Sequence, residues 1–149
     1  MYKNILVAID LTEVPSARVL ECAKSLMGAD SRLFILHVIE PPYAQYSFDP
    51  SFTGSMIHTL EERAKSSAIQ RLAELCDPFA IEEVDQYVDI GHPATLIHEF
   101  SRTRNCDLII VGTHGHRGWQ RILGSTANAV LHGTQIDVYV CRIASDPSD

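Results

Sequence analysis

The sequence predicts an α/β fold in which helices cover both faces of a doubly wound, five-stranded parallel sheet. Short runs rich in isoleucine and valine alternate with longer segments of helical periodicity, and this alternation requires parallel strands joined by right-handed crossovers. Three of the runs are almost continuously apolar, as expected for strands covered on both faces. The 149 residues, 46% of them hydrophobic, suit one domain. We expect it to span residues 1–143, followed by a frayed polar tail at 144–149.

Five strands and four helices are predicted to alternate along the chain. The strands are expected at residues 5–9, 33–39, 84–88, 108–111 and 136–141. The helices are expected at residues 13–28, 55–76, 93–103 and 125–133. The second helix carries one apolar stripe, which consists of Met56, Leu60, Ala64, Ala68, Leu72 and Leu75. Residues 40–54 form the one long irregular segment, either a packed loop or a lid.

Composition and the N-terminus exclude several classes of protein. Nineteen acidic residues against twelve Lys and Arg give a formal net charge of −7, which disfavours general nucleic-acid binding. No apolar stretch reaches the ~18 residues of a transmembrane helix, and the N-terminus does not read as a signal peptide. We therefore expect a cytoplasmic protein with no nucleic-acid or membrane partner. Its four widely spaced cysteines are expected to be reduced and mostly buried.

The segment after the fourth predicted strand has the composition of an anion site. In a doubly wound sheet, ligands bind beyond the carboxyl ends of the strands at the switch point, here after strands one and four. Residues 108–136 contain no Asp or Glu, but hold several glycines, histidines and arginines. Glycines let backbone N–H groups face a ligand, and a helix starting at Ser125 and Thr126 adds a positive dipole end and two hydroxyls. These features predict a phosphate site; the alternative is a loop whose glycines only satisfy turn geometry.

Several stretches resemble the universal stress protein family. They are KNILVAID, LFILHVIE, the step Gly91-His92-Pro93, and CDLIIVGTHGHRG…LGSTANAVL. The resemblance covers essentially the whole chain and implies a Rossmann-like fold, a homodimer and accumulation under stress or growth arrest. One branch of the family binds ATP through the motif G-x2-G-x9-G-(S/T), whereas another branch lacks the motif and does not bind ATP.

In this chain the family motif falls on Gly112, Gly115, Gly124 and Ser125, with eight residues instead of nine before the last glycine. Two positions after Ser125, where ATP-binding members often carry a hydroxyl, stands Ala127. The resemblance also implies that Asp10 lies by the nucleotide and that Val38 meets adenine through its backbone. The nucleotide-binding residues expected are Ile9, Asp10, Thr12, Val38, Gly112, His114, Gly115, Arg117, Gly124, Ser125 and Thr126.

Two of these residues have structural alternatives, and a nearby pair of histidines lacks the further ligands of a zinc site. Asp10 either holds a ribose hydroxyl or the Mg²⁺ of a Mg-nucleotide, or serves as a capping or turn residue. Thr12 suits a helix N-cap better than a ligand contact. His114 and His116 have no Cys or acid in the same loop to complete a zinc site.

The last predicted strand is expected at an edge of the sheet, where an apolar strand is a pairing hazard unless covered. The resemblance implies that this strand pairs across a two-fold axis to form the homodimer. The residues expected at that contact are Asp137, Val138, Tyr139, Val140 and Cys141.

Three functions are compatible with these observations. The first is a cytoplasmic stress-response module that binds ATP with Mg²⁺ as a switch or sensor and acts on a protein partner that the sequence does not identify. The second is a dimeric stress-protection or scaffold protein that binds no nucleotide, favoured by the shortened motif and Ala127. The third is an enzyme of adenylyl chemistry. Such enzymes usually have a phosphate-binding loop after the first strand, and this function is disfavoured because residues 11–15 contain no glycine. We assign no catalytic residue, and any ATP hydrolysis is expected to be slow.

Overall fold

The computed structural model describes residues 1–11, 13–41, 53–113 and 123–143, without the side chains of 13–15. It contains one parallel sheet with the strand order β3-β2-β1-β4-β5, which confirms the predicted fold class. The strands are β1 (Asn4–Ile9), β2 (Arg32–Ile39), β3 (Gln86–Ile90), β4 (Leu108–Gly112) and β5 (Asp137–Cys141). Strand β5 lies at an edge of this sheet, as predicted, next to β4.

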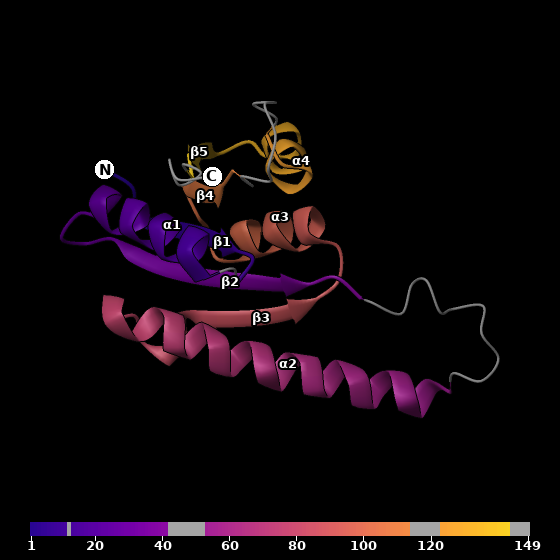
Figure 1. Cartoon of the computed structure of the whole chain (residues 1–149). Helices are drawn as coiled ribbons and strands as arrows, with labels where there is room; N and C mark the ends of the chain where they lie inside the picture. Colours follow the sequence, from indigo (N-terminus) through magenta and orange to yellow (C-terminus); the bar gives the residue numbers. More distant parts are fainter. Residues whose placement is uncertain (12, 42–52, 114–122, 144–149) are drawn as a thin grey trace, which may run out of the picture.

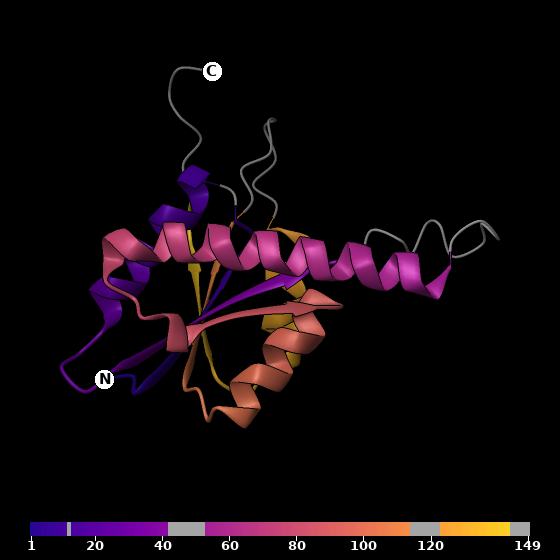
Figure 2. The same ribbon diagram turned by 90° about the horizontal axis from the view of Figure 1, so that it is seen from below.

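Helices cover both faces of the sheet (Figure 1, Figure 2). The α-helices are α1 (Glu13–Leu26), α2 (Gly54–Cys76), α3 (Pro93–Thr103) and α4 (Ser125–Gly133). Two 3₁₀ helices, η2 (Asp77–Phe79) and η3 (Glu83–Asp85), connect α2 to β3. No helix in the described part of the chain is long and apolar enough to cross a membrane.

Two apolar layers hold the helices to the sheet because successive strand residues face opposite sides. Ile5, Val7 and Ile35 lie in the layer with α1 and α2. Leu6 and Phe34 lie in the layer with α3 and α4. The helices wind over one face from β1 to β3 and over the other from β3 to β5. The winding therefore reverses between the adjacent strands β1 and β4.

The third strand begins later than predicted. Residues 84–88 were expected to be extended, but Glu83–Asp85 form η3 and β3 starts at Gln86. The Val84 side chain is 61% exposed. An isolated valine in a polar segment therefore resembles the start of a strand, whereas the strand itself runs from Gln86 to Ile90.

The predicted apolar stripe of α2 is buried only in its C-terminal half. Ala68 and Leu72 pack on the sheet, whereas Met56 and Leu60 are 48% and 44% exposed. Figure 1 shows the N-terminal half of α2 extending beyond the strands. Met56 and Leu60 are exposed because the helix is longer than the part of the sheet it covers.

Parts of two further predictions lie outside the described residues. Residues 42–52, most of the long irregular segment, are not described, and neither is the polar tail at 144–149. The other predicted boundaries differ from the structure by no more than two residues at either end.

Burial predicts different outcomes for two Leu→Ala substitutions on α2. Leu72, 1% exposed, loses core contacts, so Leu72→Ala should lower the free energy of unfolding by about 2–5 kcal/mol. Leu60, 44% exposed, is the matched control, and Leu60→Ala should change it by no more than about 0.5 kcal/mol. Urea unfolding of both variants measures the difference. Equal losses would contradict the projecting N-terminal half of α2.

Candidate functional site

A pocket opens where the winding of the sheet reverses, beyond the carboxyl ends of β1, β2 and β4. Its volume is about 370 Å³, within the range of small-molecule sites. Parts of α1, α3 and α4 complete its walls. The lining residues are Ala8, Ile9, Asp10, Ser16, Val19, His37, Val38, Ile39, Glu40, Pro93, Ile97, Val111, Gly112, Thr126, Ala127 and Ile143.

Five of the residues predicted from sequence lie together in this lining. They are Ile9, Asp10, Val38, Gly112 and Thr126. Gly124 and Ser125 start α4 beside the pocket but are not part of its lining. The remaining four candidates, Thr12, His114, Gly115 and Arg117, lie outside the described residues.

The Asp10 carboxylate is held at the rim of the pocket by the first turns of α1. The Ser16 hydroxyl donates a hydrogen bond of 3.2 Å to Asp10 Oδ1. Ser16 is only 1% exposed, whereas Asp10 is exposed. A buried hydroxyl thus orients a solvent-accessible carboxylate, which is an acceptor for hydroxyl donors or a ligand for a cation.

The turn after β1 is held in place from α2. Leu11 has a positive φ of 61°, a conformation that non-glycine residues seldom adopt. Its carbonyl oxygen accepts a hydrogen bond of 2.7 Å from Arg71 Nη2. The Leu11 side chain is buried at 5% exposure. A charged hydrogen bond and side-chain burial therefore both stabilise the turn that presents Asp10.

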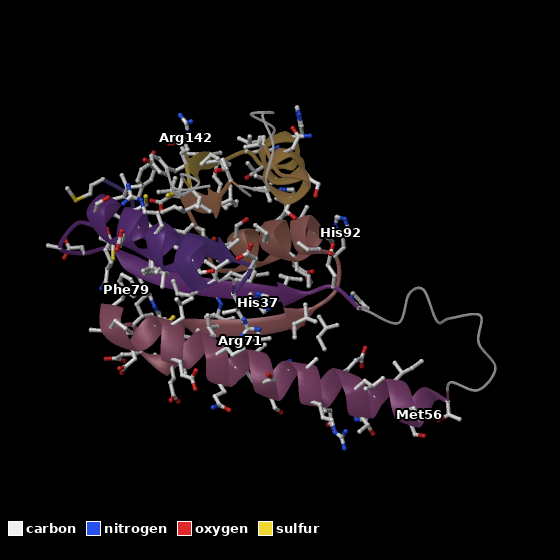
Figure 3. The ribbon with its side chains drawn as sticks, viewed as in Figure 1. His37, Met56, Arg71, Phe79, His92 and Arg142 are labelled. Carbon is white, nitrogen blue, oxygen red and sulfur yellow. The ribbon has the colours of Figure 1, made fainter. Side chains whose placement is uncertain are left out.

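His37 is the polar side chain in the middle of the apolar β2 run. Its Nδ1 lies 2.8 Å from the Ile9 carbonyl oxygen, and because a carbonyl only accepts, Nδ1 carries the proton when the ring is neutral. Burial lowers the pKa of His37, and the Arg71 charge lowers it further, while the Ile9 carbonyl and Asp10 oppose this effect. Figure 3 shows His37 of β2 beside Arg71 of α2.

The lack of a side chain at Gly112 sets the shape of the pocket wall at the end of β4. A Cβ atom there would lie 2.7 Å from Ile143 Cδ1 and 2.9 Å from Val19 Cγ2. Both side chains line the pocket, so any larger residue would push them into it. The absence of a side chain at Gly112 is therefore required for the present shape of this wall.

The N-terminus of α4 supplies an anion-binding end to the pocket. Its first helical hydrogen bond runs from Asn128 N to the Gly124 carbonyl, so the N–H groups before Asn128 have no helical acceptor. No acidic side chain occupies this first turn, and Thr126 contributes to the lining. Free N–H groups, the helix dipole and a hydroxyl are the elements of a phosphate site.

Sequence reasoning missed the pocket residues contributed by other elements. The packing of α1, α3 and the segment after β5 around the switch point brings in Ser16, Val19, Ile97 and Ile143. His37 could have been found from the sequence, because a histidine within an otherwise apolar strand indicates a polar contact at that position. No group of three or more metal-ligating side chains is present in the described ranges, and a role for Asp10 toward Mg²⁺ stays a prediction.

Comparison with known proteins assigns the chain to a family. The model of the universal stress protein family matches residues 1–142. The chain belongs to the universal stress protein family. A relative from Coxiella burnetii, named universal stress protein A homolog 2, is 36% identical over 143 residues, which cover 95% of this chain and 96% of the relative.

Two solved structures share the fold of this chain. The hypothetical protein MJ0577 superposes with a TM-score of 0.77 at 22% identity, covering 98% of this chain and 99% of its own. A universal stress protein solved in complex with cAMP gives a TM-score of 0.56 at 20% identity, covering 93% of this chain and 95% of its own. At these identities the likeness shows the fold.

The lowered pKa of His37 predicts a pH-dependent stability. An unfolded chain has a histidine pKa of about 6.5, so below that pH the unfolded state takes up a proton more readily than the folded state, and stability falls. His37→Asn keeps an N–H donor for the Ile9 carbonyl but does not titrate. The melting temperature of the native protein should therefore drop more steeply than that of the variant as the pH falls below about 6.5.

Both proteins share the other titrating groups, so the difference between their melting temperatures reports the titration of His37. The melting temperatures of the two proteins could instead fall equally with pH, or that of the native protein could fall less. Either result would contradict a His37 side chain buried in its neutral form. The ring resonances of His37, followed by NMR against pH, provide an independent measurement of its pKa.

Proposed function

We propose that this universal stress protein binds ATP with Mg²⁺ in the pocket at the switch point and acts as a cytoplasmic switch or sensor in the stress response. The observation that carries the proposal is the position of this pocket between Asp10, Gly112 and the N-terminus of α4. The relative solved with cAMP binds an adenine nucleotide on the same fold, which adds support.

The distribution of charge along the pocket favours one orientation of the nucleotide. Asp10 and Glu40 lie at the ends of β1 and β2, whereas α4 presents its positive end beside β4 without an acidic residue in its first turn. Phosphates are stabilised at the helix end and repelled by the two carboxylates. The phosphates therefore lie toward Thr126, and the base lies toward Val38.

The remaining residues suit the base and the ribose. Ile39, Pro93 and Ile97 offer apolar surface near the end of β2, next to the Val38 backbone. Asp10 faces the ribose hydroxyls or the Mg²⁺ that accompanies the phosphates. Bound Mg²⁺ would supply positive charge to the phosphate oxygens, and we assign no residue to the activation of water.

A member that binds no nucleotide remains the second candidate. The eight-residue spacing of the motif and Ala127 favour it. In the structure, Ala127 is 3% exposed, packs in the layer of α3 and α4, and also lines the pocket. The position at which ATP-binding members often carry a hydroxyl therefore offers the pocket a methyl group.

The proposal predicts that Thr126→Val weakens ATP binding while the fold is kept, because valine has the same shape but lacks the hydroxyl. Loss of a hydrogen bond to a charged phosphate should lower the affinity about tenfold or more. Thr59→Val on α2 removes an exposed hydroxyl far from the pocket and is the matched control. Calorimetric titration with Mg-ATP measures both variants.

Equal affinities of the two variants would remove Thr126 from the site. A native protein that co-purifies with no nucleotide and gives no heat of binding would contradict the proposal as a whole. The chain would then fall in the branch that binds no nucleotide.

We also propose that two copies associate through the free edge of β5. Val138 and Val140 face the layer of α3 and α4, whereas Tyr139 is 43% exposed. An edge strand with an exposed aromatic side chain is suited to pairing with a second copy. The contact surface would consist of Asp137, Val138, Tyr139, Val140 and Cys141.

The dimer proposal predicts that native protein at micromolar concentration sediments above the monomer mass of 16.6 kDa. Tyr139→Lys places a charge at the edge and should shift the protein toward monomer. Leu131→Lys, at a 39% exposed position on α4, is the control and should leave the association unchanged. A native protein that sediments only at the monomer mass would overturn the proposal.

A further inference from the structure

Two cysteines that are 119 residues apart in the chain bring their sulfur atoms together. Cys22 Sγ on α1 and Cys141 Sγ on β5 lie 2.6 Å apart. Cys22 is partly exposed, whereas Cys141 is only 1% exposed. The pair therefore combines one thiol that a solute can reach with one that is covered by the protein.

The other two cysteines have no such arrangement. Cys76 and Cys106 are 0% and 6% exposed and lie in separate apolar layers, Cys76 beside α1 and α2 and Cys106 beside α3 and α4. Burial raises the pKa of each thiol to about 11. Buried protonated thiols react slowly with oxidants, so the chain carries its own inert cysteines for comparison.

We propose that Cys22 and Cys141 form an intramolecular disulfide when the protein meets hydrogen peroxide, which makes this pair a reversible oxidation site. A disulfide needs a sulfur–sulfur separation of about 2.05 Å, and two adjacent thiols approach it by small side-chain rotations. Disulfides in reducing compartments are usually transient and redox-sensing. The proposal does not depend on nucleotide binding.

The chemistry proceeds in two balanced steps. The Cys22 thiolate attacks one oxygen of the peroxide, the O–O bond breaks, and the departing hydroxide takes a proton to become water. Cys22 is then a sulfenic acid. Cys141 Sγ attacks the Cys22 sulfur, the S–O bond breaks, and the hydroxide released takes the Cys141 proton. Two thiols are oxidised to one disulfide while one peroxide is reduced to two waters.

The surroundings of the two thiols set the order of these steps. Burial and the contact with Cys22 raise the pKa of Cys141 to about 12, so Cys141 stays a thiol and reacts only after Cys22 is oxidised. Cys22, at the partly exposed position, meets the peroxide first. The short distance between the sulfurs favours closure of the disulfide over further oxidation of Cys22.

The bond would tie the edge strand to the first helix. Val19, one turn before Cys22, and Ile143, two residues after Cys141, both line the pocket beside Gly112. A bond between two cysteines that are 119 residues apart restricts the conformations of the unfolded chain. Oxidation should therefore raise the melting temperature by about 10 °C and fix one wall of the pocket.

The test treats the reduced full chain with hydrogen peroxide and follows thiols, mass and melting temperature. The expected result is loss of two alkylatable thiols, a mass lower by two hydrogen atoms, a cross-linked Cys22–Cys141 peptide and the higher melting temperature, all reversed by dithiothreitol. Cys22→Ser should lose all of these responses. Cys76→Ala, the matched control, should retain them.

Two results would overturn the proposal. In one, Cys22 gains one to three oxygen atoms while Cys141 remains alkylatable. In the other, the disulfide forms only between chains. If Cys22→Ser does not fold, peptide mapping of the oxidised native protein decides between the same outcomes.

Discussion

The pairing of β1 with both β2 and β4 is the constraint on which the rest of the structure depends. In the register, Val7 lies between Ile35 and Ile110, and all three side chains are fully buried. These side chains pack against α1 and α2. Because the chain winds outward from β1 in both directions, the connections after β1 and β4 diverge to opposite faces and open a pocket between them.

The chemistry of that pocket follows from what the two diverging connections present. After β1, the turn at Leu11 is held by Arg71 and leads to the Asp10–Ser16 hydrogen bond. After β4, Gly112 brings the backbone close to Val19 and Ile143, and α4 presents its N-terminus. One side thus carries carboxylate charge and the other carries backbone donors, which is why the proposed nucleotide has a defined direction in the pocket.

Most of the fold is readable from the sequence because local patterns determine it. The apolar runs of β1, β2 and β4 and the proline that starts α3 each mark an element by their own chemistry. Local patterns do not show how far one element extends past another, so the exposure of Met56 was missed. They also misplaced the start of β3, since Val84 resembles a strand residue without being buried.

The candidate site could be predicted in part for the same reason. Asp10, Gly112 and Thr126 follow from strand ends and a helix start, which the sequence marks directly, whereas Val38 follows from the family resemblance. Ser16, His37 and Ile143 belong to the pocket only through packing of distant segments. The contact between Cys22 and Cys141 is of the same kind, since nothing near either cysteine in the sequence indicates its partner.

The most direct test of nucleotide binding at the switch point is an NMR titration of ¹⁵N-labelled protein with Mg-ATP. If ATP binds there, the backbone amide signals of Asp10, Val38, Gly112 and Thr126 should shift together with one affinity. The signals of Leu60 and Ile69, on the exposed side of α2, should stay in place. Shifts confined to another surface, or none at millimolar nucleotide, would contradict it.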